Sequence, residues 1–220
     1  MVPNLYPAFD RQEVVIHGSR HVRSLTELSA GELFLVAEAW RERARAADAE
    51  GFPYLHAFVN EGPAAGASLP HSHSQLVWLP EPPPAVRDEG GSGACRVCML
   101  LATERGAGTR LVAERGGLTA LCPGAGRQPY ELLVAPAEHD ADGFGNRLGD
   151  ALVLVADLVR ALQAIEGPVA WNAWLHLGAH WHVEVVPRLS ELAGIELGAG
   201  IHVLTVAPED AAAALRAQRP

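Results

Sequence analysis

Two short stretches of this chain carry paired histidines with identical spacing. Residues 71–75 read His-Ser-His-Ser-Gln, and residues 180–184 read His-Trp-His-Val-Glu. Because side chains alternate across a strand, each His-x-His pair is expected to place two imidazoles on one face. Imidazole is well suited to metal binding, proton transfer and nucleophilic attack near neutral pH. The recurrence of the pair indicates an internal duplication.

The duplication extends upstream of both pairs. Residues 13–21 and 131–139 each run from an acidic residue through an apolar, strand-like stretch to a histidine with the same spacing. Each is followed by an amphipathic helical stretch, an apolar strand and then the His-x-His strand. A chance similarity between apolar runs is the alternative interpretation. We therefore expect two histidine-bearing repeats, residues 1–85 with the active-site motif and residues 90–220 with a structural metal site.

The elements that must position these histidines follow from apolar periodicity and from Gly and Pro. A proline-rich run at 80–84 and a glycine-rich run at 89–93 separate the repeats. Short strands with few helices predict an α+β fold, resembling two pseudo-repeats that form one largely antiparallel sheet with packed helices. The expected strands are residues 13–17, 54–59, 71–79, 111–113, 118–121, 131–134, 169–175, 181–186 and 201–206, and the expected helices are residues 29–47, residues 148–165 and a short one from Pro208.

The composition excludes several classes of function. The chain has 220 residues, 49% hydrophobic content and a net charge of −9, so broad attraction to nucleic acid or to an anionic membrane is not expected. Every basic residue is arginine apart from the histidines, which removes lysine nucleophiles from consideration. No apolar run is long enough to span a bilayer, and no leader is evident. We expect a cytoplasmic enzyme.

The loop before the first histidine pair has the composition of a phosphate site. Residues 60–70 are rich in Gly, Ala and Pro, and small residues let backbone amides approach a ligand. Asn60, Ser68 and Gln75 supply neutral donors for phosphate oxygens. His73 is placed to attack phosphorus, and Gln75 on the same face would hold a non-bridging oxygen. The alternative is a polar loop beside structural histidines.

A second group of residues has the types and order of a zinc site in repeat two: Cys95, Cys98, His139 and His180. Two thiolates two residues apart with two imidazoles give the closed tetrahedral coordination of structural zinc. A reduced cysteine pair under a loop is one alternative, and a site joining His176 to the histidines of the second pair is another. Cys122 is expected in the core.

Other histidines and one glutamate are assigned no chemistry. His17, His56 and His202 are expected to be structural or exposed. Glu184 stands where repeat one has Gln75, and a carboxylate there would repel phosphate, so repeat two is not expected to carry out phosphoryl transfer.

The string from residue 60 to residue 75 resembles the active-site segment of galactose-1-phosphate uridylyltransferases, in the histidine-triad superfamily. That family carries Asn, a Gly-rich turn, Ser and then His-Pro-His-x-Gln, and Ser72 stands here in place of the proline. The resemblance covers almost the whole chain. Further similar stretches are residues 4–8, 21–28, 181–189 and 193–200.

The resemblance implies a role for each matching residue. His73 would be the histidine that becomes nucleotidylated, and Gln75 its phosphate-binding partner. Asn60, Gly66 and Ser68 would line the phosphate pocket. His71 and His21 would be metal ligands, although the family's earlier segment with a Cys-x-x-Cys is not seen before them. Residues 195–200 would contribute to the sugar-phosphate site of a neighbouring subunit, so a homodimer is expected.

The function implied is nucleotidyl transfer through a covalent nucleotidyl-histidine. A nucleotide sugar would give up its nucleoside monophosphate to His73, and a second sugar 1-phosphate would take it, with zinc as the structural cofactor. Two alternatives stay open: a phosphorylase or hydrolase, with phosphate or water as acceptor, and a truncated, inactive paralogue that serves as a binding subunit.

Overall fold

One continuous antiparallel sheet organises the molecule. The computed structural model describes residues 1–87 and 93–218. Nine strands lie in the order β1-β2-β4-β3-β8-β9-β7-β6-β5. Their bounds are β1 Val2–Pro3, β2 Gln12–Ile16, β3 Tyr54–Glu61, β4 His73–Leu79, β5 Leu111–Arg115, β6 Leu118–Leu121, β7 Leu132–Pro136, β8 Trp171–His176 and β9 His182–Pro187.

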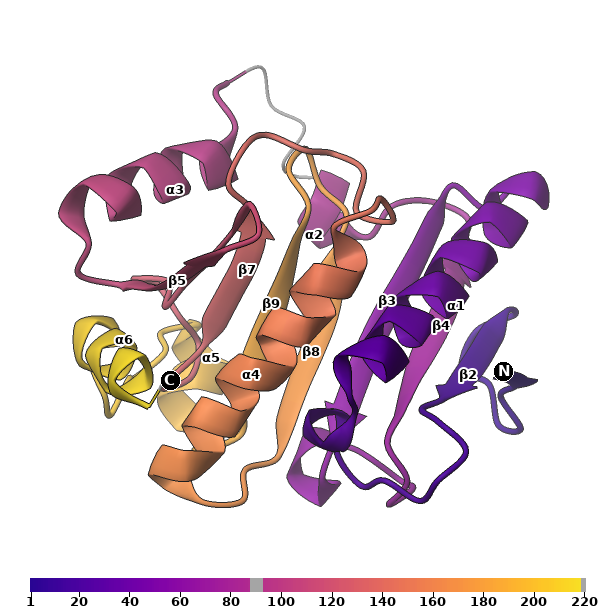
Figure 1. Cartoon of the computed structure of the whole chain (residues 1–220), viewed down its shortest axis with the longest axis horizontal. Coiled ribbons are helices and arrows are strands. Elements are labelled where there is room, and N and C mark those ends of the chain that lie inside the picture. The colour runs from indigo at the N-terminus through magenta and orange to yellow at the C-terminus, as the bar shows by residue number, and fades with distance from the viewer. Residues whose placement is uncertain (88–92, 219–220) are drawn as a thin grey trace.

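Two long helices cover one face of this sheet (Figure 1). They are α1 (Ala30–Ala49) and α4 (Leu148–Glu166), and α1 begins with the capping box that Ser29 and Glu32 predict. The other helices are α2 (Pro84–Arg87), α3 (Arg96–Ala107), α5 (Gly194–Ala199) and α6 (Pro208–Ala217), with the 3-10 turns Leu25–Glu27 and Pro63–Ala65. No helix in the described part of the chain is long and apolar enough to cross a membrane.

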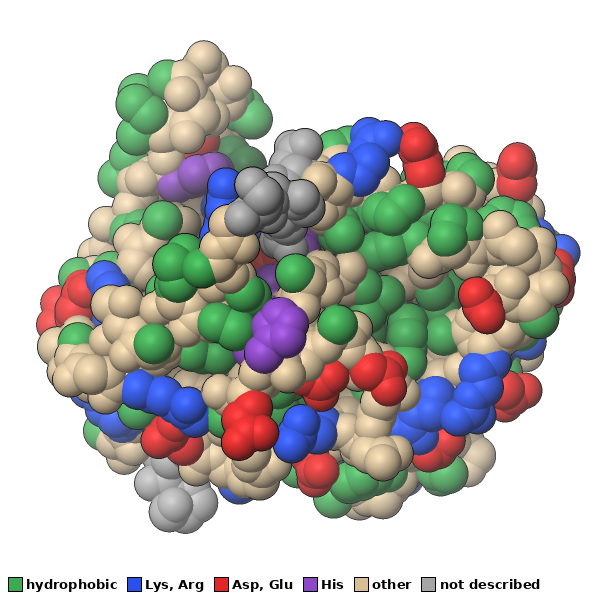
Figure 2. Space-filling view, turned by 90° about the horizontal axis from the view of Figure 1, so that it is seen from above, with side chains coloured by type: hydrophobic (Ala, Val, Ile, Leu, Met, Phe, Trp, Pro, Cys, Tyr) green, Lys and Arg blue, Asp and Glu red, His purple; other side chains and the backbone are tan. Residues whose placement is uncertain are grey.

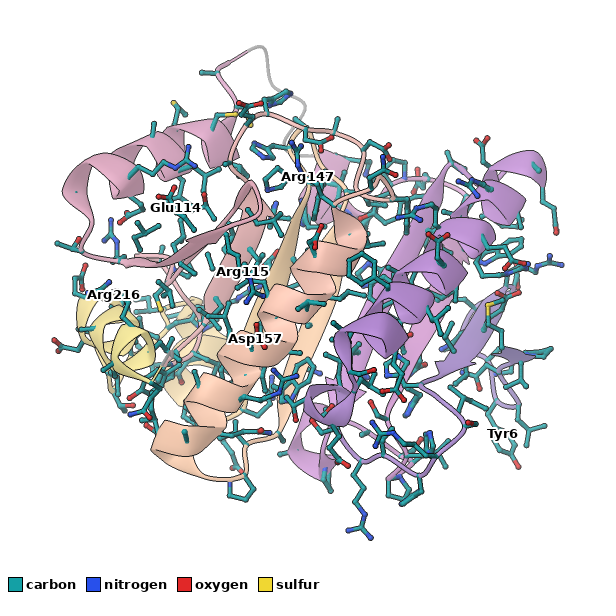
Figure 3. The ribbon with its side chains drawn as sticks, in the orientation of Figure 1. Tyr6, Glu114, Arg115, Arg147, Asp157 and Arg216 are labelled. Carbon is teal, nitrogen blue, oxygen red and sulfur yellow. The ribbon has the colours of Figure 1, made fainter. Side chains whose placement is uncertain are left out.

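Alternation along the strands decides which side chains enter the core. In β3, Leu55, Ala57 and Val59 face the helices and join the main core cluster. The residues between them, such as His56 and Phe58, lie on the opposite face. Asp157 of α4 and Arg115 of β5 point toward one another at 2.6 Å and tie this helix to the sheet edge (Figure 3).

The predicted repetition is visible in the strand pattern. The elements β2-α1-β3-β4 recur in the same order as β7-α4-β8-β9, and the two sets meet where β3 pairs with β8. The prediction of an α+β fold with a largely antiparallel sheet is therefore confirmed. Helix α3 lies on the sheet face opposite α4, with Val97 and Leu101 packed on Leu133 of β7.

Three details differ from the sequence-based expectation. The histidine strands begin at His73 and His182, so the first histidine of each pair lies just before its strand. Residues 201–206 form no strand, because they lie outside the sheet and Ile201 and Val203 are more than half exposed. An apolar run becomes a strand only where it finds a pairing partner. The helix over Arg96–Ala107 was not predicted.

Candidate active site and metal centre

His73 opens β4 on the sheet face that α1 and α4 leave uncovered, and its side chain is 6% exposed. Its Nδ1–H donates to the carbonyl oxygen of His71 at 2.9 Å. A neutral imidazole with the proton on Nδ1 carries its lone pair on Nε2. Nε2 makes no hydrogen bond to any described residue, so it is the nitrogen available for nucleophilic attack.

Gln75 lies one pleat further along the same face. Its side-chain oxygen accepts from Gln12 Nε2 at 2.7 Å, and the oxygen of Gln12 accepts from the backbone N–H of Ala8 at 2.8 Å. This chain of hydrogen bonds fixes the Gln75 amide with its oxygen toward β2. The NH₂ group is then left as the donor for a ligand. Gln12 was not recognised in the sequence, since only the pairing of β2 with β4 brings it here.

Asn60 lies near the end of β3, beside His73. Its side-chain oxygen accepts from Asn172 Nδ2 of β8 at 2.8 Å, and the same nitrogen donates to the carbonyl of Ala65 at 2.8 Å. The Asn60 amide is thus oriented like that of Gln75, with its own NH₂ group left to donate. Gln75 and Asn60 therefore place two neutral amide donors on the sheet face that carries His73.

A cavity of about 330 Å³ adjoins Asn60, and neither His73 nor Gln75 is among the residues that line it. Asn60, Ser68 and His71 line it together with Arg23, a cation that the sequence analysis did not single out. Gly66 follows the 3-10 turn with φ +84°, a left-handed conformation that favours glycine, and it lies next to this lining without being part of it. The cavity combines neutral donors with the guanidinium of Arg23, which suits a phosphate group, and its lining also includes the carboxylate of Glu61.

Gly62 is the glycine in the described lining of this cavity, and the approach of Ala170, the residue before β8, explains it. A Cβ on Gly62 would lie 2.7 Å from the Cβ of Ala170, and its φ of +84° disfavours any side chain. The neighbouring carboxylate of Glu61 accepts from the backbone of Leu25 at 2.8 Å and from Trp171 Nε1 at 3.0 Å. Burial nevertheless raises the pKa of Glu61.

The four predicted zinc ligands come together at the start of α3. The ligand atoms of Cys95, Cys98, His139 and His180 all lie within 4.8 Å of one another. Cys98 Sγ is 3.3 Å from Nδ1 of each histidine. Tetrahedral zinc, with Zn–S of about 2.3 Å and Zn–N of about 2.0 Å, separates sulfur and nitrogen by roughly 3.5 Å, so the residues fit this metal.

The orientation of His180 supports metal binding. Its Nε2–H donates to the carbonyl of Pro136 at 3.0 Å, which leaves the Nδ1 lone pair facing Cys98. Cys95 is the N-cap of α3, so Cys98 follows one helical turn later on the same side. His180 therefore points to the cysteines rather than to His176, against the alternative site that joins those two histidines.

Repeat one contains a matching histidine pair without thiolates. His71 Nε2–H donates to the carbonyl of His17 at 3.1 Å, and its Nδ1 lies 3.4 Å from Nδ1 of His21. The ring centroids of this pair are 5.3 Å apart, as are those of His139 and His180. Among the described residues, no third Cys, His, Asp or Glu joins His21 and His71 as a potential ligand.

His182 repeats the backbone contact of His73 in a different environment. Its Nδ1–H donates to the carbonyl of His180 at 3.1 Å. Glu184, in the position of Gln75, forms an ion pair with Arg127 and accepts from Trp174 Nε1 at 3.1 Å. Burial alone would raise the pKa of Glu184, but hydrogen bonds from two histidines and the charge of Arg127 hold it well below the usual range. An ionised carboxylate therefore occupies this position.

Side-chain types are unevenly distributed over one face of the molecule. Seen from above, histidine side chains reach the surface near the middle of the molecule, where most neighbouring side chains are uncharged (Figure 2). The charged side chains gather mainly along one edge of this view.

Comparisons with known proteins agree with this geometry. A sequence model of the galactose-1-phosphate uridyl transferase N-terminal domain matches residues 7–81. The chain is 27% identical to an ADP-glucose phosphorylase of Arabidopsis thaliana over 98% of this chain and 73% of the relative. It is 27% identical to a galactose-1-phosphate uridylyltransferase of Thermotoga maritima over 93% of this chain and 73% of the relative.

A solved structure shows the same similarity in three dimensions. A uridylyltransferase structure superposes with a TM-score of 0.86 at 28% identity, covering 99% of this chain and 78% of the other. Sequence comparison and structural superposition therefore agree. The chain is similar in sequence and in fold to galactose-1-phosphate uridylyltransferases.

Proposed function

We propose that this protein is a nucleotidyltransferase that acts on nucleotide sugars through a nucleotidyl group carried on His73. The observation that carries the proposal is the orientation of His73: its Nδ1–H is bound to a backbone carbonyl at 2.9 Å, and Nε2 is left without a partner among the described residues. An imidazole held in this way is a nucleophile in the correct tautomer before any substrate arrives.

The first half-reaction begins with attack by the Nε2 lone pair of His73 on the α-phosphorus of the nucleotide sugar. The bond from that phosphorus to the bridging oxygen breaks, and sugar 1-phosphate leaves with the electron pair. The carbonyl of His71 stabilises the cationic imidazole through Nδ1–H. The amides of Gln75 and Asn60 are placed to donate to phosphate oxygens, which gain charge as the bond breaks.

The second half-reaction returns the imidazole to its neutral form. An acceptor oxygen attacks the same phosphorus, the P–N bond breaks, and its electron pair returns to Nε2. Sugar 1-phosphate as acceptor gives a new nucleotide sugar. Inorganic phosphate gives a nucleoside diphosphate instead, and this second candidate is favoured by the similarity to an ADP-glucose phosphorylase over 98% of the chain.

Three further features belong to the proposal. Zinc would be held by Cys95, Cys98, His139 and His180, where it would join α3 to β7 and β9 and supply structural stability. A homodimer is supported by exposed apolar side chains, including Leu197, Ile201 and Val203, on the segment after β9. A cytoplasmic location stays a prediction from composition, and cell fractionation tests it.

The test is labelling of the enzyme with α-³²P-labelled ADP-glucose and UDP-glucose, without acceptor. We expect acid-labile label on the peptide that contains His73, and none in His73→Gln. His182→Gln is the matched control and should keep the label, because Glu184 excludes that histidine from phosphate chemistry. Absence of label from the unmodified protein would refute the proposal and favour a binding subunit.

Product analysis then identifies the acceptor. Labelled enzyme is mixed with sugar 1-phosphate, with inorganic phosphate or with buffer alone. Release of nucleotide sugar, nucleoside diphosphate or nucleoside monophosphate identifies a transferase, a phosphorylase or a hydrolase, respectively. If inorganic phosphate releases the label from the enzyme faster than every sugar 1-phosphate does, the phosphorylase replaces the transferase as the proposed function.

A further inference from the structure

His17 is a fully buried histidine whose imidazole lies on the helix side of the sheet, behind the strand that carries His73. Its side chain is 0% exposed. Nδ1 is 2.9 Å from the hydroxyl of Ser72, and Nε2 is 3.1 Å from the hydroxyl of Ser74. These two serines are the residues immediately before and after His73. A single imidazole therefore bridges both sides of the proposed nucleophile.

The direction of these hydrogen bonds follows from a fourth side chain. Trp40 Nε1–H donates to the hydroxyl of Ser74 at 2.8 Å. That oxygen already accepts, so its own proton is best directed to Nε2 of His17, and Nδ1–H of His17 then donates to Ser72. A continuous chain of side-chain hydrogen bonds therefore links α1 to the beginning of β4, and it runs through Trp40, Ser74, His17 and Ser72.

The backbone of His17 contacts the same stretch. Its N–H donates to the carbonyl of Ser72 at 3.1 Å, and its carbonyl accepts from His71 Nε2–H at 3.1 Å. His17 thus contacts three of the four residues from position 71 to position 74, and it leaves His73 itself free. The peptide that carries the His71 carbonyl is also held at its N–H, which Ser72 donates to the carbonyl of Val22 at 2.8 Å, so His17 fixes this stretch together with Val22.

We propose that His17 is a positioning residue for His73: by holding Ser72 and Ser74 it keeps the His71 carbonyl on Nδ1–H and so presents the Nε2 lone pair to phosphorus. The proposal rests on the proposed function of His73. If the peptide at Ser72 rotates, the carbonyl leaves Nδ1 and the proton is free to move to Nε2. An imidazole in that tautomer has no lone pair on the nitrogen that faces the substrate.

Repeat two provides an internal comparison. The residues around His182 are Trp181 and Val183, both buried, and within the described part of the chain no histidine bridges them as His17 bridges Ser72 and Ser74. The strand itself forms without such a bridge, and His182 still reaches the carbonyl of His180 at 3.1 Å. The polar chain through His17 is therefore not required for the fold of the repeat, which points to a role in the chemistry of His73.

The experiment compares His17→Leu with Val155→Ala, a control that loses core packing in α4 far from β4. Both are assayed where each is fully folded. For His17→Leu we expect kcat to fall between about tenfold and a hundredfold, with KM changed less than about twofold, because a misplaced nucleophile slows the chemical step rather than binding. Val155→Ala should keep kcat. His17→Gln, which can still reach one serine, should recover part of the loss.

A second readout does not depend on activity. In protein labelled with ¹⁵N-histidine, the His73 nitrogen shifts report which nitrogen carries the proton. Nδ1–H should dominate in the unmodified protein and in Val155→Ala, and the Nε2–H form should gain population in His17→Leu. If His17→Leu fails to fold, Ser72→Ala removes one end of the bridge at smaller cost and should shift kcat and tautomer in the same direction.

The two measurements separate the possible failures. An unchanged tautomer with unchanged kcat in folded His17→Leu or Ser72→Ala would overturn the positioning role. An equal fall of kcat in Val155→Ala would also overturn it, since general destabilisation would then explain the loss. If the unmodified protein forms no nucleotidyl-His73, the proposed function fails, and the tautomer shift alone decides whether His17 orients His73.

Discussion

Lowering the pH should weaken the fold through one side chain, the imidazole of His17. Burial, followed by the nearby His73 and His71, lowers the pKa of His17 from 6.5 to about 3. Below pH 6.5 the unfolded chain binds a proton at this residue and the folded chain does not. The free energy of unfolding therefore decreases as the pH falls, and this loss continues until the pH reaches the folded pKa of about 3.

The magnitude follows from the two pKa values. Each pH unit between them changes stability by about 1.4 kcal/mol. Between pH 7 and pH 5, His17 alone should cost the protein about 2 kcal/mol. His17→Gln removes this titration while every other group is retained. The stability advantage of the unmodified protein over His17→Gln should therefore shrink by about 2 kcal/mol over that interval.

The assay is urea unfolding at pH 7, 6 and 5, followed by fluorescence of the five tryptophans. Taking the difference between the two proteins cancels contributions that they share, including metal release and the other buried histidines. Parallel stability curves for the two proteins would refute the argument, because they would show that His17 titrates alike in the folded and unfolded chains.

Three further changes test the site. Cys98→Ser should lower zinc content from about one per chain to near zero and decrease thermal stability. Cys122→Ala, which removes a thiol outside the cluster, should keep the metal. Equal zinc content in the two variants would contradict the ligand assignment. Gln75→Ala should reduce kcat about a hundredfold, and Gln12→Leu, which only frees the Gln75 amide to rotate, should reduce kcat less. A larger loss of kcat in Gln12→Leu than in Gln75→Ala would exclude a role for Gln12 that acts through Gln75. Gly62→Ala should cost about 1–3 kcal/mol in urea unfolding, because its Cβ would overlap a neighbouring alanine, and an unchanged midpoint would show that the turn can move away.

Much of the fold could be predicted because its signals are local. Alternating and apolar runs predicted eight of the nine strands of the sheet to within a few residues. A capping box predicted the start of α1, and a wide apolar face predicted α4. The prediction of a strand at residues 201–206 was wrong because pairing depends on non-local contacts. The apolar pattern of this segment does not show whether a pairing partner exists. The bend before each histidine strand was also missed, because it depends on what His71 and His180 contact.

The site was predictable where its residues carry distinctive chemistry in a short motif. His73 and Gln75 lie two residues apart, and the cysteine pair is equally compact. Gln12, Arg23 and Gly62 were missed because each acts through a neighbour distant in sequence. Gln12 reaches Gln75 only through the register of β2 against β4, and Gly62 is required only because Ala170 approaches it.

The two repeats show how one scaffold separates structure from chemistry. Both hold a histidine with Nδ1–H on the carbonyl two residues earlier, but Nε2 of His182 lies 3.7 Å from the carboxylate of Glu184. The difference arises at the next position on that face. Gln75 is a neutral donor held by another amide, and Glu184 is an ionised acceptor held by Arg127. A carboxylate beside His182 would repel a phosphate group, whereas an amide beside His73 would donate a hydrogen bond to it. We therefore propose phosphate chemistry for repeat one, while the same position in repeat two forms an internal ion pair.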